Sequence, residues 1–160
     1  MPLFADSSYY VALLLTSDQG HARAVQLTLE LDSPVITTAW VLTEVANTLS
    51  AQRLRAGFLS LLDDLQSDSG VVIVGPEAET FAQGIELYRS RSDKDWSLTD
   101  CISFVVMTRE GITEALTADR DFEQAGFKAL LKEIVPRTMK KTAQIEISIQ
   151  PVESPVICTP

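Results

Sequence analysis

Short apolar runs alternate with longer stretches of helical periodicity along most of this chain. Runs at residues 2–5, 34–37, 71–74, 114–117 and 127–131 are expected to form strands. Apolar residues recur at helical spacing over residues 7–15, 21–31, 38–53, 58–66, 76–90 and 101–108. The run at 71–74 contains only Val and Ile, which is typical of a strand buried on both faces. This alternation predicts a three-layer α/β/α fold with a central parallel sheet.

Capping and turn residues set the expected limits of several helices. Thr37 or Thr38 can cap the third helix, and Gly57 is expected to separate it from the fourth. Pro76 is expected to open the next helix. The sequence Ser97-x-x-Asp100 resembles a capping box, in which both side chains bind free backbone N–H groups.

Four carboxylates lie just past predicted strands or in the opening turns of the helices that follow. They are Asp6, Glu44, Asp100 and Asp119. The carboxyl ends of parallel strands share one edge of a sheet, so all four can face one crevice. Like charges at close range raise one another's pKa unless a cation lies between them. Mg²⁺ and Mn²⁺ prefer oxygen ligands, so the pattern predicts a site for one of these ions.

The chemistry of phosphodiester hydrolysis suggests a role for each acid. A divalent ion can activate a water molecule and neutralise charge on the phosphate. We expect Asp6 and Asp100 to be the main metal ligands and Asp119 to complete the site or hold a second ion. Glu44 would ligate through water or orient the nucleophile. His21 is the single histidine and is expected on the surface of a helix away from this edge, so histidine-based catalysis is not expected.

Each acid also has a simpler interpretation. Asp6 could cap a helix, Glu44 could be a solvated helix residue, and Asp100 could serve only the capping box. Asp119 and Asp121 could be turn residues. Taken together, four acids that converge on one edge favour the metal site.

Composition limits the possible partners. The 160 residues carry a formal net charge of −9, whereas a domain that grips nucleic acid with its whole surface is usually basic. An RNA substrate would therefore depend on bound metal and on a local basic strip. Candidates are Arg53, Arg55, Arg89, Arg91, Lys94, Arg109 and Arg120. The acidity also favours a basic protein partner.

Other classes of protein lack support in the sequence. There is no phosphate-binding glycine loop, no serine-hydrolase elbow and no Cys or His cluster with zinc spacing. No apolar run approaches the roughly 20 residues of a membrane-spanning helix. Two cysteines cannot form a disulfide framework, so a cytoplasmic location is expected.

Four segments carry a resemblance to a known family. Phe4-Ala5-Asp6-Ser7-Ser8 opens the chain, followed by Leu42-Thr43-Glu44-Val45-Ala46-Asn47, Leu98-Thr99-Asp100-Cys101 and Thr117-Ala118-Asp119-Arg120-Asp121-Phe122. In this order and spacing they resemble PIN-domain nucleases, and most closely the VapC-type toxins of prokaryotic toxin–antitoxin modules. The resemblance covers about residues 1–131.

The resemblance implies a Mg²⁺- or Mn²⁺-dependent endoribonuclease. Asp6, Glu44, Asp100 and Asp119 match the family's acidic quartet. Asp121 falls where some members have a further acid, and Thr117 and Ser7 match polar positions near the family's site. The resemblance also implies a homodimer and a cognate antitoxin. The alternative is a PIN-like binding or regulatory module with little or no nuclease activity.

The resemblance also suggests how the chain is divided. Residues 1–135 are expected to form the PIN-like domain, and residues 136–160 a C-terminal extension that is expected to be flexible. Within the extension, Ile145, Ile147 and Ile149 alternate with polar residues and could add an edge strand.

Overall fold

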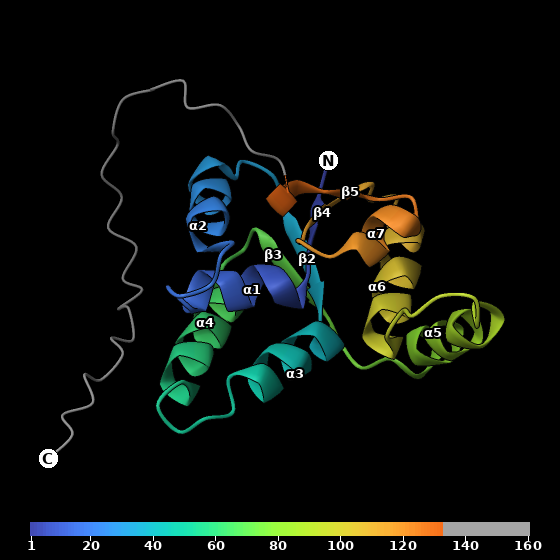
Figure 1. Ribbon diagram of the computed structural model, residues 1–160, viewed down its shortest axis with the longest axis horizontal. Helices are drawn as coiled ribbons and strands as arrows, with labels where there is room; N and C mark the ends of the chain where they lie inside the picture. The colour runs from blue at the N-terminus through green and yellow to red at the C-terminus, as the bar shows by residue number, and fades with distance from the viewer. Residues whose placement is uncertain (133–160) are drawn as a thin grey trace, which may run out of the picture.

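A five-stranded parallel sheet forms the centre of the protein in the computed structural model, which describes residues 1–132 (Figure 1). The strand order is β3-β2-β1-β4-β5. The strands are β1 (Leu3–Ala5), β2 (Val35–Thr38), β3 (Val71–Val74), β4 (Glu114–Leu116) and β5 (Lys128–Ala129). The predicted extension at residues 136–160, including its alternating isoleucines, lies outside the described residues and remains a prediction.

Helices cover both faces of the sheet. They are α1 (Ser7–Leu14), α2 (His21–Glu30), α3 (Ala39–Thr48), α4 (Arg55–Ser67), α5 (Ala78–Ser90), α6 (Leu98–Arg109) and α7 (Arg120–Gln124), followed by a 3₁₀ turn, η1 (Leu130–Lys132). Helices α1, α2 and α4 lie on one side and α5 and α6 on the other (Figure 1). The predicted α/β/α architecture is confirmed. No helix within residues 1–132 is long and apolar enough to cross a lipid bilayer.

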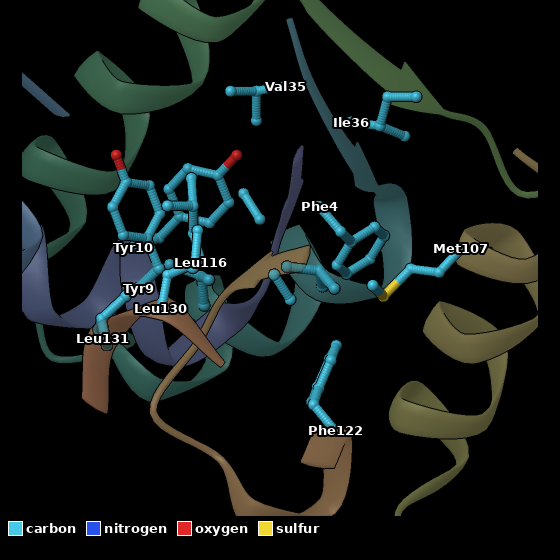
Figure 2. Packing of buried hydrophobic residues seen from close by; sticks show 14 of the residues in the cluster. Phe4, Tyr9, Tyr10, Val35, Ile36, Met107, Leu116, Phe122, Leu130 and Leu131 are labelled. Carbon is cyan, nitrogen blue, oxygen red and sulfur yellow. The ribbon is translucent and has the colours of Figure 1, made fainter. Parts of the chain in front are cut away.

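The hydrophobic core fills the space on both faces of β1 and β4. Phe4 lies on the side of α6, near Met107, whereas Leu116 lies on the side of α1 with Tyr9 and Tyr10 (Figure 2). This opposition follows from the strand geometry, in which successive side chains point to opposite faces.

An aromatic chain joins the sheet to α6 and α7. The ring centroid of Phe122 in α7 lies 6.1 Å from that of Phe4 and 5.0 Å from that of Phe104. Trp96 meets Phe104 edge to face, with 5.0 Å between their centroids. Because Asp119 immediately precedes α7, this packing holds Asp119 near the start of α6.

The prediction that residues 71–74 are buried on both faces is wrong. β3 is an edge strand that pairs with β2, and Val72 is 52% exposed. Val71 and Ile73 pack against the core, and α4 contacts the strand. Within the described residues, no element covers the face of β3 that carries Val72. The run of β-branched residues therefore indicates a strand but does not indicate that both of its faces are buried.

Several local predictions also differ from the structure. The helix expected to open at Pro76 begins at Ala78, and the strand expected over residues 127–131 is the shorter β5 followed by η1. The third helix ends at Thr48 instead of residue 53, and Gly57 lies inside α4 instead of before it. The buried Leu49 is the C-cap residue of α3. His21 is half-buried, with its Nδ1 2.8 Å from the Ala12 carbonyl oxygen, and is not a free surface residue.

The strand order creates a switch point between β1 and β4. The chain moves outward from β1 to β2 and β3, then returns to place β4 on the other side of β1. Connections leave β1 and β4 in opposite directions there, and the carboxyl ends of strands at such a point are where parallel α/β sheets usually form a binding crevice. Asp6 and Thr117 directly follow these two strands.

Candidate active site

Asp6 directly follows β1 at this edge of the sheet and is 4% exposed. Its backbone N–H donates to Leu116 O at 3.2 Å, which continues the β1–β4 pairing. Its side chain caps α1, and Oδ2 accepts hydrogen bonds from the Thr117 hydroxyl at 2.8 Å and the Ser8 hydroxyl at 2.9 Å. Burial raises the pKa of Asp6, and the hydroxyl donors oppose that rise.

Asp100 both completes a capping box and faces the other acids. Its Oδ2 accepts from the Ser97 backbone N–H at 2.8 Å, while the Ser97 hydroxyl accepts from the Asp100 N–H at 3.0 Å. Its Oδ1 has no hydrogen-bond partner within residues 1–132. Burial raises the pKa of Asp100 to about 6, and the charges of Asp6 and Asp119 contribute to the rise. The capping role and a functional role are therefore compatible.

Asp119 and Asp121 approach Asp100 from the start of α7. Asp119 caps this helix by accepting from the Asp121 N–H at 2.9 Å through Oδ1. One carboxylate oxygen from each of Asp100, Asp119 and Asp121 lies within 4.8 Å of the others. Burial raises the pKa of Asp121, and Asp119 adds to the rise.

Glu44 reaches the same region from the second turn of α3. Burial raises its pKa first, and the charges of Asp6 and Asp119 raise it further. Hydrogen bonding with Thr99 and Ser7 opposes the rise. The four acids of the expected quartet thus interact electrostatically, although only Asp100 and Asp119 belong to the tight three-acid cluster, together with Asp121.

The charge balance of the crevice suits a cation. Within residues 1–132, no ion pair joins a Lys or Arg to Asp6, Glu44, Asp100 or Asp119. Mg²⁺ binds oxygen at about 2.1 Å, so ligands on opposite sides of the ion are about 4.2 Å apart. One carboxylate oxygen from each of Asp100, Asp119 and Asp121 lies within 4.8 Å of the others, which is close to that spacing. The donor set of carboxylate oxygens therefore fits a small divalent cation.

Ser8 is the residue of this site that sequence reasoning missed. Its hydroxyl contacts Asp6, Thr117 and the backbone of Ala118. The predicted supporting residue Ser7 makes a weaker contact, with its Oγ 3.4 Å from Asp6 Oδ1. Both serines follow Asp6 directly, so nothing in the sequence separates them. The conformation of the first turn of α1 places the Ser8 hydroxyl, and not that of Ser7, toward the residues that follow β4.

The predicted basic strip is partly neutralised. Exposed ion pairs join Arg89 to Glu86, Arg91 to Asp93, and Arg109 to Glu77 and Glu110. Exposed pairs of this kind contribute little to stability. They do show that these arginines already have acidic neighbours.

Together these features define an α/β protein with an acidic crevice at its β1/β4 switch point. The chain belongs to the PIN domain family, whose profile matches residues 3–128. The resemblance expected from the four acidic segments is thereby confirmed.

Known relatives agree with this assignment. The chain is 30% identical over 126 residues to the 23S rRNA-specific endonuclease VapC20 of Mycobacterium tuberculosis, covering 78% of this chain and 95% of the relative. The crystal structure of VapC20, described as a sarcin–ricin loop cleaving toxin, superposes with a TM-score of 0.72 at 26% identity over the same shares of the two chains. VapBC2 from Rickettsia felis, in a complex with a promoter DNA fragment, shares the fold with a TM-score of 0.58 and 14% identity, covering 81% of this chain and 97% of that one.

Proposed function

We propose that this protein is a metal-dependent endoribonuclease that hydrolyses RNA phosphodiester bonds, and that it acts as the toxin of a toxin–antitoxin pair. The observation that carries the proposal is the convergence of acidic side chains beyond β1 and β4. Asp6 and Asp100 are buried there, and neither they nor Glu44 and Asp119 form an ion pair with a Lys or Arg within residues 1–132. The 30% identity to VapC20 over 95% of that protein supports RNA as the substrate. The same substrate makes the cytoplasm the expected location.

The geometry of the acids supports the following roles. Asp6, Asp100 and Asp119 are the proposed metal ligands, and Asp121 is a further candidate because it belongs to the three-acid cluster. Asp100 keeps Oδ1 free of hydrogen bonds within the described residues, which makes that oxygen the natural ligand atom. Glu44 is half-buried at the edge of the group and would orient the attacking water. Thr117 and Ser7 support Asp6 through their hydroxyls.

Mg²⁺ or Mn²⁺ would lower the pKa of a bound water and neutralise charge on the scissile phosphate. The chain itself contributes to the electrostatics of the site, because Asp6 and Ser97 are the N-cap residues of α1 and α6, so both helices have their N-termini near the acidic residues. Helix N-termini carry partial positive charge and favour anions such as phosphate.

A cleavage assay with metal controls tests the proposal. The purified protein is incubated with a panel of structured RNAs, including a hairpin that reproduces the sarcin–ricin loop, in Mg²⁺, Mn²⁺ or EDTA. Cleavage is expected with metal and not with EDTA. Asp6→Asn and Asp100→Asn are each expected to reduce the rate at least ~100-fold, because loss of a residue that merely hydrogen-bonds to a metal ligand already costs about 10–100-fold.

Asp63→Asn is the matched control, since Asp63 is an exposed acid on α4. Cleavage by Asp6→Asn or Asp100→Asn at the rate of the parent would refute the site assignment. Metal binding without cleavage of any RNA would instead favour the binding or regulatory module.

Two protein partners belong to the proposal. A basic segment of a cognate antitoxin fits the acidic crevice and the net charge of −9. Expression of the protein alone is then expected to arrest bacterial growth, and Asp100→Asn is expected to relieve the arrest.

A second copy of the chain is the other proposed partner, bound through the outer face of α5. Phe81 and Tyr88 are 42% and 52% exposed, lie seven residues apart on this helix, and flank the half-buried Ile85. Trp40 of α3 stacks on Phe81, with 6.4 Å between the ring centroids. We call these four residues the α5 stripe. A two-fold axis near residues 84 and 85 would set Phe81 of one copy against Tyr88 of the other, which makes the stripe self-complementary.

A further inference from the structure

The Ser8 hydroxyl lies where the β1–α1 junction meets the turn between β4 and α7. Its Oγ is 2.9 Å from Asp6 Oδ2, 3.1 Å from Thr117 Oγ1 and 3.2 Å from the Ala118 backbone nitrogen. The last two contacts join residues about 110 positions apart in the sequence. Ser8 therefore connects two strands of the sheet at the site.

The proton positions in this group follow from its chemistry. An ionised carboxylate accepts hydrogen bonds and donates none, so the Ser8 and Thr117 hydroxyls both donate to Asp6 Oδ2. Their oxygens then accept from the backbone: Ala118 N–H donates to Ser8 Oγ, and Asp119 N–H donates to Thr117 Oγ1 at 3.0 Å. Two series of hydrogen bonds thus end on Asp6 Oδ2. One runs from the Ala118 N–H through the Ser8 hydroxyl, and the other runs from the Asp119 N–H through the Thr117 hydroxyl.

This arrangement distinguishes the two oxygens of Asp6. Oδ2 receives two short hydrogen bonds and a third, longer one from the Ser8 N–H at 3.4 Å. Within residues 1–132, the one hydrogen bond to Oδ1 is the 3.4 Å contact from the Ser7 hydroxyl. Oδ2 has little remaining capacity as an acceptor, whereas Oδ1 remains available as a ligand atom.

We propose that Ser8 is a positioning residue for the metal site. Together with Thr117 it fixes the Asp6 carboxylate with Oδ1 available, and it ties Asp6 to the turn that carries Asp119. This role goes beyond capping of α1. A cap needs only a bond from the start of the helix to Asp6, while Ser8 also receives the Ala118 N–H of a distant turn. The inference rests on the proposed metal-dependent function.

The test compares two variants that differ only in a hydroxyl. Ser8→Thr keeps the hydroxyl and Ser8→Val replaces it with a methyl group of similar size, and both residues are β-branched. Mn²⁺ affinity of the metal-free protein is measured by calorimetry. Ser8→Val is expected to bind Mn²⁺ about 10- to 100-fold more weakly than the parent, as is usual when the support of a ligand is lost. Ser8→Thr is expected to stay within about threefold of the parent.

Amide hydrogen exchange supplies a readout that needs no metal. The Ala118 N–H donates to Ser8 Oγ, so loss of this oxygen in Ser8→Val is expected to speed hydrogen exchange of the Ala118 amide. Ser8→Thr keeps the oxygen and is expected to leave this exchange rate unchanged. Ser60→Val is the matched control, because Ser60 is an exposed serine in α4; it is expected to change neither readout. Ser8→Ala removes the hydroxyl without adding volume and repeats the test if Ser8→Val does not fold.

The outcomes separate this inference from the proposed function. Mn²⁺ binding by the parent, with equal binding by Ser8→Val or Ser8→Ala, would overturn the role of Ser8 and leave the metal site intact. Failure of the parent to bind Mn²⁺ or Mg²⁺ would overturn both. Weak binding by the variants without the hydroxyl, restored in Ser8→Thr, supports the role.

Discussion

One carboxylate oxygen of each proposed metal ligand accepts hydrogen bonds from nearby groups. Asp6 Oδ2 accepts from Ser8 and Thr117, Asp100 Oδ2 accepts from the Ser97 N–H, and Asp119 Oδ1 accepts from the Asp121 N–H. These bonds lock each side chain into one orientation while its second oxygen remains available. In the sequence, helix capping and metal binding are alternative interpretations of these acids. In the structure the two roles are compatible, because the capping bonds use one oxygen and orient the other. A ligand held in this way needs little reorganisation when a cation binds.

The raised pKa of Asp100 leads to a prediction about stability and pH. Its pKa is about 6 in the folded protein against an ordinary value of 3.8, so between these values the folded protein binds more protons than the unfolded chain. The free energy of unfolding of the metal-free protein is therefore expected to fall as the pH rises from about 4 to about 7. The Asp100 contribution is at most about 3 kcal/mol. Urea unfolding in EDTA across this range measures it.

Asp100→Asn is the informative control for this effect. Its amide oxygen can still accept from the Ser97 N–H, but it carries no charge to desolvate. We expect this variant in EDTA to be more stable than the parent at neutral pH by about 1–3 kcal/mol and to depend less on pH. Mn²⁺ is expected to stabilise the parent at neutral pH and the variant much less. A parent whose stability rises with pH in EDTA would contradict the prediction.

The contact between α5 and α6 depends on the absence of a side chain at Gly84. A Cβ at this buried position would clash with Ile102 Cγ1 of α6. Alanine normally favours a helix over glycine by about 1 kcal/mol, but overpacking costs about 1–3 kcal/mol. Gly84→Ala is therefore expected to destabilise the protein, as measured by thermal unfolding. In the double variant with Ile102→Ala, the loss should be smaller than the sum of the two single losses.

The elements of the fold were predictable where local chemistry determines them. The strand runs, the Ser97–Asp100 capping box and the helix start after Asp6 all follow from residue types close in sequence. The exposure of β3 was not predictable, because it depends on which strands pair beside it and on what covers them. The end of α3 at Thr48, just before the buried Leu49, was not predicted either.

In the candidate site, too, some features were predictable from the sequence and others depend on contacts between distant residues. The convergence of the acidic residues follows from the topology of a parallel sheet, so the sequence pattern was sufficient to indicate it. The choice of Ser8 over Ser7 as the main hydroxyl partner of Asp6 depends on long-range contacts with Thr117 and Ala118. No property of two adjacent serines in a sequence distinguishes them.

The whole molecule combines a strongly acidic charge with the apolar α5 stripe, and the two have opposite effects on self-association. Burial of Phe81 and Tyr88 against a second copy would remove exposed aromatic surface from water. The net charge of −9 on each copy opposes association at long range. Salt screens that repulsion, with a Debye length of about 10 Å at 0.1 M. We therefore expect the proposed dimer to become tighter as the salt concentration rises.

Sedimentation equilibrium at low and high salt tests this prediction. Phe81→Glu is expected to weaken the dimer at least tenfold, because it places two charges in the apolar centre of a two-fold interface. Leu59→Glu is the matched control: Leu59 is 57% exposed but lies on α4, away from the stripe, so it adds the same charge without touching the interface. Equal weakening by both variants would mean that net charge alone governs association. A monomer at every salt concentration would remove the dimer from the proposed function while leaving the acidic site, which lies within one chain, unaffected.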